Sequence, residues 1–440
     1  KYIQTAAPHF TTQRLKRQQT FKHLYPSQKF KEIKLQQLMS ELLKLIEKFW
    51  VQQDFDTKRL PKDLSLIKSY RQKGLYVYWE KEMPKVEITL TTETSKLEAA
   101  DIHLYDFFLA LEQHQAIEAA EQRNREPNLQ EVSDKLDCYY IVNKLKYYCK
   151  ALNYQRFQTT SYDWAMIETV LQEVEKKKWL DIPAVAIYYH GVQTLLENEN
   201  AEQHFMQLKI LLRQYVNYFV RHEMQNMFVL ARNFCIRRVQ KNKVYFQEAF
   251  DLYKIEIKEN LVIENGRFFP STYKNVTTLA LLMQDFEWLE DFLYKYEWAI
   301  VPKLFKYTLS QLRFEQQEYE EVIELLQEAE DEEVLFMLSA KMLLIKAYVE
   351  LSLTDDVLYE DKLENCLTSF MALLNRKKEM LTKHYIYYLN TVKVLKSILR
   401  ETIYSAEKDA KKLLELNIFL EKSPATTEKP WLHSLISRLM

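Results

Sequence analysis

Glycine is almost missing from this sequence. Only Gly74, Gly191 and Gly266 occur in 440 residues, where an average usage of roughly 7% would give about 31. Because glycine lets a backbone adopt positive φ or approach a ligand closely, a chain this poor in it cannot hold many phosphate-cradling loops. Neither a Walker sequence nor a Gly-x-Ser-x-Gly nucleophile elbow occurs. The scarcity of glycine therefore argues against the commonest nucleotide-binding and hydrolase classes.

Cysteine and net charge are low as well. The four cysteines, Cys138, Cys149, Cys235 and Cys366, are widely spaced and form no Cys-x-x-Cys pair. This pattern predicts buried thiols in a reducing compartment rather than a disulfide framework or a zinc site. The formal net charge of −1 gives no global basic surface for nucleic acid or anionic lipid.

No apolar run is long enough to predict a transmembrane helix. The longest charge-free stretch, residues 182–196, spans 15 residues and contains Pro183, His190 and Gly191. A span through a bilayer needs about 18–20 apolar residues. We therefore expect a cytoplasmic protein with no membrane partner.

Local signatures of catalysis and metal binding are also lacking. His222-Glu223 has no second histidine at the spacing of a zinc site. The acidic run from Thr354 to Asp361 resembles a magnesium-binding motif, but no second acidic set accompanies it, so we expect Thr354 to cap a helix. We predict no catalytic residue, no metal and no cofactor. A Ser/His or Cys/His pair assembled in space stays open.

Helical patterning dominates what is present. Hydrophobic residues make up 47% of the chain, proline is sparse, and apolar residues recur at three- and four-residue steps. The sequence therefore predicts an all-α fold, with early helices at 28–53, 63–82 and 97–123. In the first of these, apolar residues from Ile33 to Trp50 recur at three- and four-residue steps, which places them on one face. Residues 86–90 alternate like a strand but have no obvious partner strand, so we expect a loop or a helix there.

A repeat of about 33 residues is the main sign of organisation. Asp285-Phe286-Glu287 is echoed by Glu318-Tyr319-Glu320, and Leu309, Ser310, Leu326 and Ala329 stand at the large and small positions of the same unit. In these residues the chain resembles the tetratricopeptide-repeat superfamily, although Gln317 stands where that pattern prefers glycine. It is also similar, over most of residues 30–420, to a family of bacterial proteins with degenerate repeats and no assigned activity.

The resemblance implies an α-solenoid, a superhelix of antiparallel helix pairs. We expect a basic entry segment at 1–30 that is disordered in part, an N-terminal helical region at 31–130, and the solenoid at 131–422. The polar stretch at 121–134 is the expected linker between the last two. Residues 423–440 are predicted to form a flexible spacer and a short capping helix.

The same resemblance supplies candidate binding residues. First helices of such pairs line a concave groove that receives peptides, and position-by-position matching places Arg232, Gln311 and Lys346 there, with Asn143 and Lys144 by looser analogy. Each of them could equally be an ordinary solvent-facing side chain.

The function these features favour is a non-enzymatic scaffold that binds a protein or peptide along the concave face. Two alternatives remain at this stage. One is an enzyme whose site is assembled from distant helices. The other is a helical repeat that binds nucleic acid through stacked aromatic side chains, which the near-neutral charge disfavours.

Overall fold

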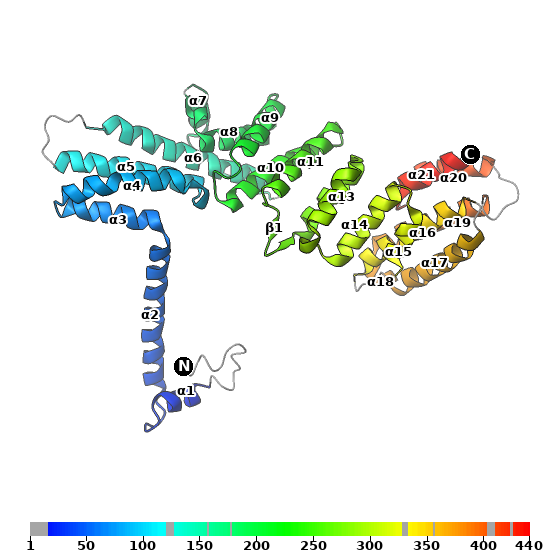
Figure 1. Cartoon of the computed structure of the whole chain (residues 1–440), viewed down its shortest axis with the longest axis horizontal. Coiled ribbons are helices and arrows are strands. Elements are labelled where there is room, and N and C mark those ends of the chain that lie inside the picture. The colour runs from blue at the N-terminus through cyan, green and yellow to red at the C-terminus, as the bar shows by residue number, and fades with distance from the viewer. Residues whose placement is uncertain are drawn as a thin grey trace. The chain divides into compact units, whose positions relative to one another are not determined.

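The computed structural model describes residues 16–119, 127–155, 158–176, 178–327, 333–354, 357–402, 410–422 and 426–440, with the side chains of 357, 358 and 410 excepted. Within these ranges the chain is helical from α1 to α21, with one two-stranded hairpin (Figure 1). The predicted all-α class is confirmed. No helix in the described ranges combines the length and apolarity needed to cross a membrane.

The chain divides into two compact units, residues 1–230 and 231–440. The first contains α1 (Arg17–Leu24), α2 (Glu32–Thr57), α3 (Arg59–Gln72), α4 (Tyr76–Thr92), α5 (Ala99–Ala119), α6 (Leu129–Gln155), α7 (Ile167–Lys176), α8 (Pro183–Leu196) and α9 (Ala201–Gln214); α10 (Arg221–Arg238) begins in this unit. Helix α6 packs against both α5 and α8, and α8 packs against α9. The boundary predicted at residue 130 thus falls inside one unit.

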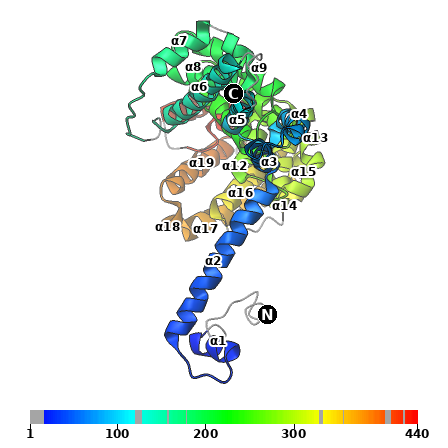
Figure 2. The same cartoon turned by 90° about the vertical axis from the view of Figure 1, so that its left-hand side faces the viewer.

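Helix α2 corresponds to the helix predicted at 28–53, but its apolar side chains are not buried. Only Leu35 is, while Leu45 is 63% exposed and Trp50 59% exposed. Figure 2 shows most of α2 extending away from α3. The predicted apolar face is thus present but largely uncovered in the described part of the first unit, because periodicity identifies an apolar face without showing that anything covers it.

Two further details of this unit differ from the sequence prediction. The helix predicted at 63–82 is divided into α3 and α4 by Gly74, whose φ of +70° ends α3. Residues 86–90 lie within α4, where Val86, Thr89 and Leu90 are buried at helical spacing. Packing on this face overrides the strand preference of the β-branched residues. Of the basic entry segment, residues 1–15 lie outside the described ranges.

The second unit begins in the last turns of α10 and continues with α11 (Val244–Lys258), strands β1 (Ile263–Glu264) and β2 (Arg267–Phe268), α12 (Pro270–Leu282), α13 (Phe286–Lys295), α14 (Pro302–Glu315), α15 (Tyr319–Leu326), α16 (Val334–Ser352), α17 (Val357–Arg376), α18 (Lys378–Leu381), α19 (Lys383–Arg400), α20 (Ala410–Lys422) and α21 (Lys429–Leu439). From α11 to α17 each helix packs against the next. The expected capping helix is α21, and its Leu432, Leu435 and Ile436 join a continuous apolar core.

The small hairpin was not predicted. Asn265 and Gly266 both have positive φ, at +50° and +76°, and join two antiparallel two-residue strands. Positive φ at both central residues is the condition for the tightest hairpin turn, for which Asn-Gly is the strongest short signal. This turn brings Phe268 into the core of the second unit.

The turns within two successive helix pairs are alike. Gln284, after α12, and Gln317, after α14, have φ of +55° and +66°. The amide of the next residue reaches back to the last helical turn in both, from Asp285 to Ala280 and from Glu318 to Arg313. This is the left-handed helix end that usually carries glycine, and it explains why Gln317 aligns with a glycine position. Ala329 and the acids Asp355 and Asp356 lie outside the described ranges, and Thr354 bonds to the carbonyl of Leu351 at the end of α16.

Candidate functional site

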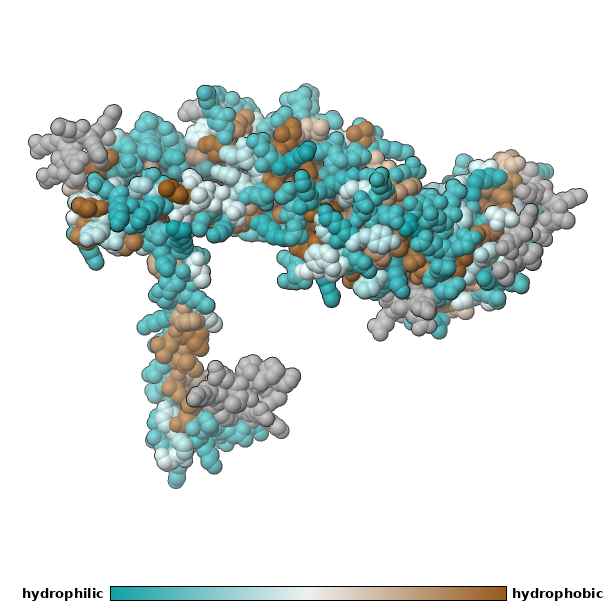
Figure 3. Space-filling view, viewed as in Figure 1, coloured by the Kyte–Doolittle hydropathy of each residue, from teal (hydrophilic) through white to brown (hydrophobic). Residues whose placement is uncertain are grey.

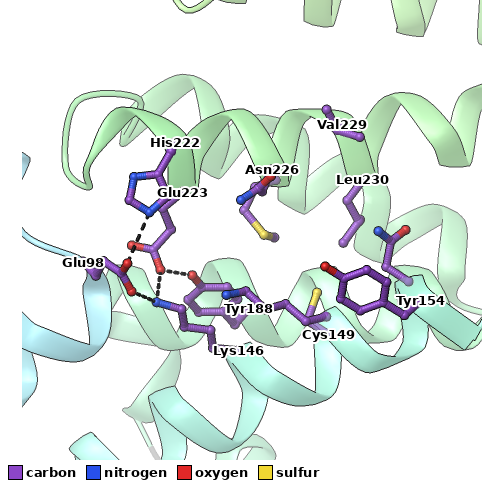
Figure 4. Close-up of a pocket in the computed structure, with 13 residues that line it drawn as sticks. Glu98, Lys146, Cys149, Tyr154, Tyr188, His222, Glu223, Asn226, Val229 and Leu230 are labelled. Carbon is purple, nitrogen blue, oxygen red and sulfur yellow. Dashed lines mark hydrogen bonds and ion pairs between the residues drawn. The ribbon is translucent and has the colours of Figure 1, made fainter. Parts of the chain in front are cut away.

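A groove between α6 and α10 in the first unit is lined by charged, amide and apolar side chains. It has a volume of about 210 Å³ and is lined by side chains between Lys146 and Tyr154 on α6 and between His222 and Leu230 on α10, with Glu98 and Tyr188 at one end. Figure 4 shows charged and phenolic groups gathered at that end, with Tyr154 and Leu230 toward the other. We refer to it as the α6–α10 groove.

A buried ion cluster forms the charged end. The ammonium of Lys146 lies 2.8 Å from Oε1 of Glu223 and 2.5 Å from Oε2 of Glu98. The hydroxyl of Tyr188 donates to Oε1 of Glu223, and the backbone amide of Ala99 donates to its Oε2 at 2.8 Å. Lys146 and Glu223 have side chains only 3% and 5% exposed. Every charge in the buried part of the cluster is therefore paired, as burial requires.

The outer part of the cluster is open to solvent. Glu98 is 43% exposed and also meets Nε2 of His222 at 3.2 Å. The hydrogen bond from Lys146 lowers the pKa of Glu98, so this carboxylate stays ionised at neutral pH. With two carboxylates facing one ammonium, the cluster carries one excess negative charge when His222 is neutral.

The environment also fixes the protonation states of Lys146 and Tyr188 in the buried part of the cluster. Burial works against the charged form of Lys146, but the hydrogen bonds and attractions of Glu223 and Glu98 outweigh it and raise its pKa. Burial, with the negative charge of Glu223, raises the pKa of Tyr188 well above its usual range. Lys146 is thus held charged and Tyr188 neutral, so neither is poised to exchange a proton near pH 7.

The remaining walls combine amide groups with an apolar floor. The side-chain oxygen of Asn153 is buried and has no hydrogen-bond partner among the described residues. Across the groove, Asn226 is exposed on α10. The floor carries Cys149 and Met227, which are both buried. An amide acceptor buried without a partner costs free energy. Asn153 lines the groove, so a bound molecule whose donor reaches this oxygen would offset that cost.

The floor rests on Gly191 of α8. A methyl group added there would lie 2.8 Å from Cε of Met227 and 3.3 Å from Sγ of Cys149. Both distances are closer than van der Waals contact. The absence of a side chain at Gly191 therefore lets these two side chains sit as deep as they do.

The sequence-predicted binding residues lie elsewhere. Arg232 does not face a groove: it is 9% exposed, forms an ion pair with the buried Glu256, and stacks 4.3 Å from the ring centre of Tyr253. Matching to a repeat pattern assigned Arg232 a position on a helix, but it could not show that the guanidinium is paired with the carboxylate of Glu256.

Two other predicted residues belong to the second unit. Lys346 has a side chain only 13% exposed, bonds to Glu428 at 2.8 Å, and lies 4.7 Å from the ring centre of Phe314. This ion pair connects α16 to Glu428, the residue that precedes α21. Gln311 is half-buried on α14.

Asn143 and Lys144 lie on α6, less than one turn before the groove. The amide of Asn143 donates to the carbonyl of Tyr139 at 3.0 Å, within its own helix, and Lys144 lies 5.5 Å from the ring centre of Trp164. The predicted residues thus lie on the helix that lines the groove, but Lys146 and Asn153 were not among them, and Glu223 was considered only as part of a zinc motif. Lys146 and Asn153 are seven residues apart, which is about two helical turns, so they lie on one face of α6. This spacing is the signal that could have grouped them.

A buried Cys/His contact does exist in this unit. Sγ of Cys138 lies 3.4 Å from Nδ1 of His103, and both residues are buried. Burial raises the pKa of Cys138 to about 12 and lowers the pKa of His103 to about 4. Both groups are therefore neutral at pH 7, the opposite of the thiolate–imidazolium pair that nucleophilic catalysis needs.

Groups that could hold a metal ion are likewise missing from the described ranges: no three His, Cys, Asp or Glu side chains converge there. Comparison with known proteins adds no identity: no protein-family model, curated protein or solved structure matches this chain.

Proposed function

We propose that this chain is a non-enzymatic binding protein that receives an extended protein or peptide segment in the α6–α10 groove. The observation that carries the proposal is the side-chain oxygen of Asn153, which is buried without a hydrogen-bond partner among the described residues in a groove that a second amide, Asn226, also lines. A peptide backbone offers donors and acceptors at regular spacing, and amide side chains can bond to both.

The charges along the groove favour a segment of mixed polarity. Glu98 presents an ionised carboxylate at one end, and Lys150 is exposed one turn beyond Lys146. Charges at the rim of an interface govern selectivity and association rate more than affinity. The Met227 and Leu230 side chains provide the apolar contact that an amide pair alone would lack.

The proposal keeps the helical-repeat interpretation for the second unit, in which consecutive pairs would stack as a solenoid. Equivalent turns at Gln284 and Gln317 support it, because equal turns give equal pair geometry. The enzyme alternative finds little support in the neutral Cys138–His103 pair.

The test is a peptide-display selection on the purified full-length protein, followed by affinity measurement on the enriched sequences. The double variant N153A/N226A is expected to bind them at least about tenfold more weakly, because two hydrogen bonds are lost. The matched control is N143A, on the same helix, whose amide is used internally; its affinity should be unchanged. Failure to enrich any sequence, or equal binding by the double variant, would overturn the proposal.

A further inference from the structure

Helix α2 carries an apolar face that the described part of the first unit leaves exposed. Met39, Leu42, Leu43, Leu45, Phe49 and Trp50 are between 45% and 63% exposed. Figure 3 shows them as a hydrophobic band along the helix. Single exposed apolar residues are ordinary on a protein surface, whereas a contiguous band of this kind marks an interaction site.

The band follows the geometry of a helix-pairing surface. At about 100° per residue, the apolar positions from Leu38 to Trp50 fall within a stripe roughly 160° wide. Leu38, Leu42, Leu45 and Phe49 recur at alternating steps of four and three residues, which is the spacing of a coiled-coil seam. The partner that fits this surface is therefore another helix.

The polar face argues against a lipid surface. Between Leu38 and Trp50 it carries Glu41, Glu47, Lys44 and Lys48, so its net charge is zero. Helices that lie in a membrane interface place an excess of Lys and Arg on that face, because lipid headgroups are anionic. Charge thus favours a protein partner.

The charges beside the seam fit a second copy of α2 running in the opposite direction. Glu41 and Lys48 lie on the same flank, seven residues apart, and neither forms an ion pair within the described chain. In an antiparallel pair, each flank faces the same flank of the other helix. When Leu42 packs against Leu45 of the second copy, Glu41 faces Lys48 of that copy, and the symmetry produces the contact twice.

The opposite flank fits the same register. There Met39 faces Ile46 of the second copy, so two apolar residues meet. A parallel pair would instead place Glu41 beside Ile46, which leaves both charges unpaired. In the antiparallel register the seam residues pack together, the charges of one flank are paired, and the apolar residues of the other flank meet.

The area is sufficient for reversible association. Covering six to eight side chains of this size buries about 500–650 Å² per copy, which reaches the lower limit of specific interfaces. We propose that α2 is a self-association helix through which two copies of the chain form an antiparallel, symmetric dimer. This inference does not depend on the α6–α10 groove.

Sedimentation equilibrium of the full-length protein tests it, at low salt and up to about 100 µM, where an interface of this size should be populated. The wild type is expected to form dimers, and Leu42→Asp to weaken them at least about a hundredfold by burying a charge in the seam. Lys44→Glu, on the opposite face of α2, is the matched control and should leave the dissociation constant unchanged.

A charge exchange tests the register itself. Glu41→Lys and Lys48→Glu each place like charges opposite one another twice and should weaken the dimer about fivefold or more. The double variant E41K/K48E restores both attractions and should recover wild-type association. A monomeric wild type overturns the proposal, as does a double variant weaker than either single one. Binding of the monomer to phosphatidylcholine–phosphatidylserine vesicles through Leu42 would overturn it as well.

Discussion

Replacing Lys146 by methionine is the sharpest test of how the ion cluster holds the first unit together. The variant keeps the apolar stem of the side chain and removes the charge that Glu223 and Glu98 share. Glu98 is 43% exposed and can rehydrate. Glu223 cannot, because its side chain is 5% exposed, so its charge would stay buried with only Tyr188 and the amide of Ala99 as donors.

The expected loss follows from that asymmetry. Removing one partner of a buried ion pair typically costs about 3–5 kcal/mol. Two neutral donors continue to stabilise Glu223, so we expect K146M to lower the free energy of unfolding by about 3 kcal/mol. K150M, one turn further along α6 and exposed, should cost less than about 0.5 kcal/mol.

The assay is urea unfolding followed by hydrogen exchange in peptides from α6 and α8, which reports on the first unit alone. The double variant K146M/E223Q should cost less than the sum of the two single variants, by about 1–2 kcal/mol, because the buried charge disappears with its partner. If K146M proves as mild as K150M, or if the single effects simply add, the cluster does not stabilise the fold in the way described.

Three further predictions concern stability. Burial lowers the pKa of His103 to about 4, below its unfolded value near 6.5, so the unfolded state binds the proton first as the pH falls. The free energy of unfolding should therefore fall by about 2–3 kcal/mol between pH 6.5 and 4.5. An H103Q variant whose urea midpoint depends on pH as strongly as that of the wild type would contradict this. Gln317→Gly should raise the free energy of unfolding by up to about 1 kcal/mol by relieving the left-handed backbone. Glu315→Gly, at the last residue of α14, should lower it instead, and thermal unfolding distinguishes the two. Arg232→Met should destabilise the second unit by about 3 kcal/mol because Glu256 would stay buried without its partner, and a change below 1 kcal/mol in urea unfolding would show that the pair is dispensable.

The fold class could be predicted because it depends on local properties. Scarce glycine and recurring apolar steps identify helices, and the spacing from Phe286 to Tyr319 identifies equivalent helix starts in successive pairs. What covers a helix is not local. The apolar face of α2 has the same pattern as a buried face, so its exposure could not be foreseen from periodicity.

The groove could not be predicted for a related reason. Glu98, Lys146 and Glu223 are far apart in the sequence, and each by itself resembles an exposed charge on a helix. Only the packing of α6 and α8 and the position of α10 bring them together. The repeat pattern led instead to Arg232, because alignment conveys position along a helix and not the burial that follows from a neighbouring carboxylate.

Gly191 lies beneath the floor of the groove and sets how deep the groove is. Cys149 and Met227 settle into the space a side chain at this position would fill. The flexible end of Met227 would yield first to an added methyl group and would be pushed into the groove. A single added carbon atom at Gly191 would thus make the groove shallower without touching the ion cluster or the amides. A substitution on α8 can therefore change which partner fits, while every residue that faces the partner stays the same.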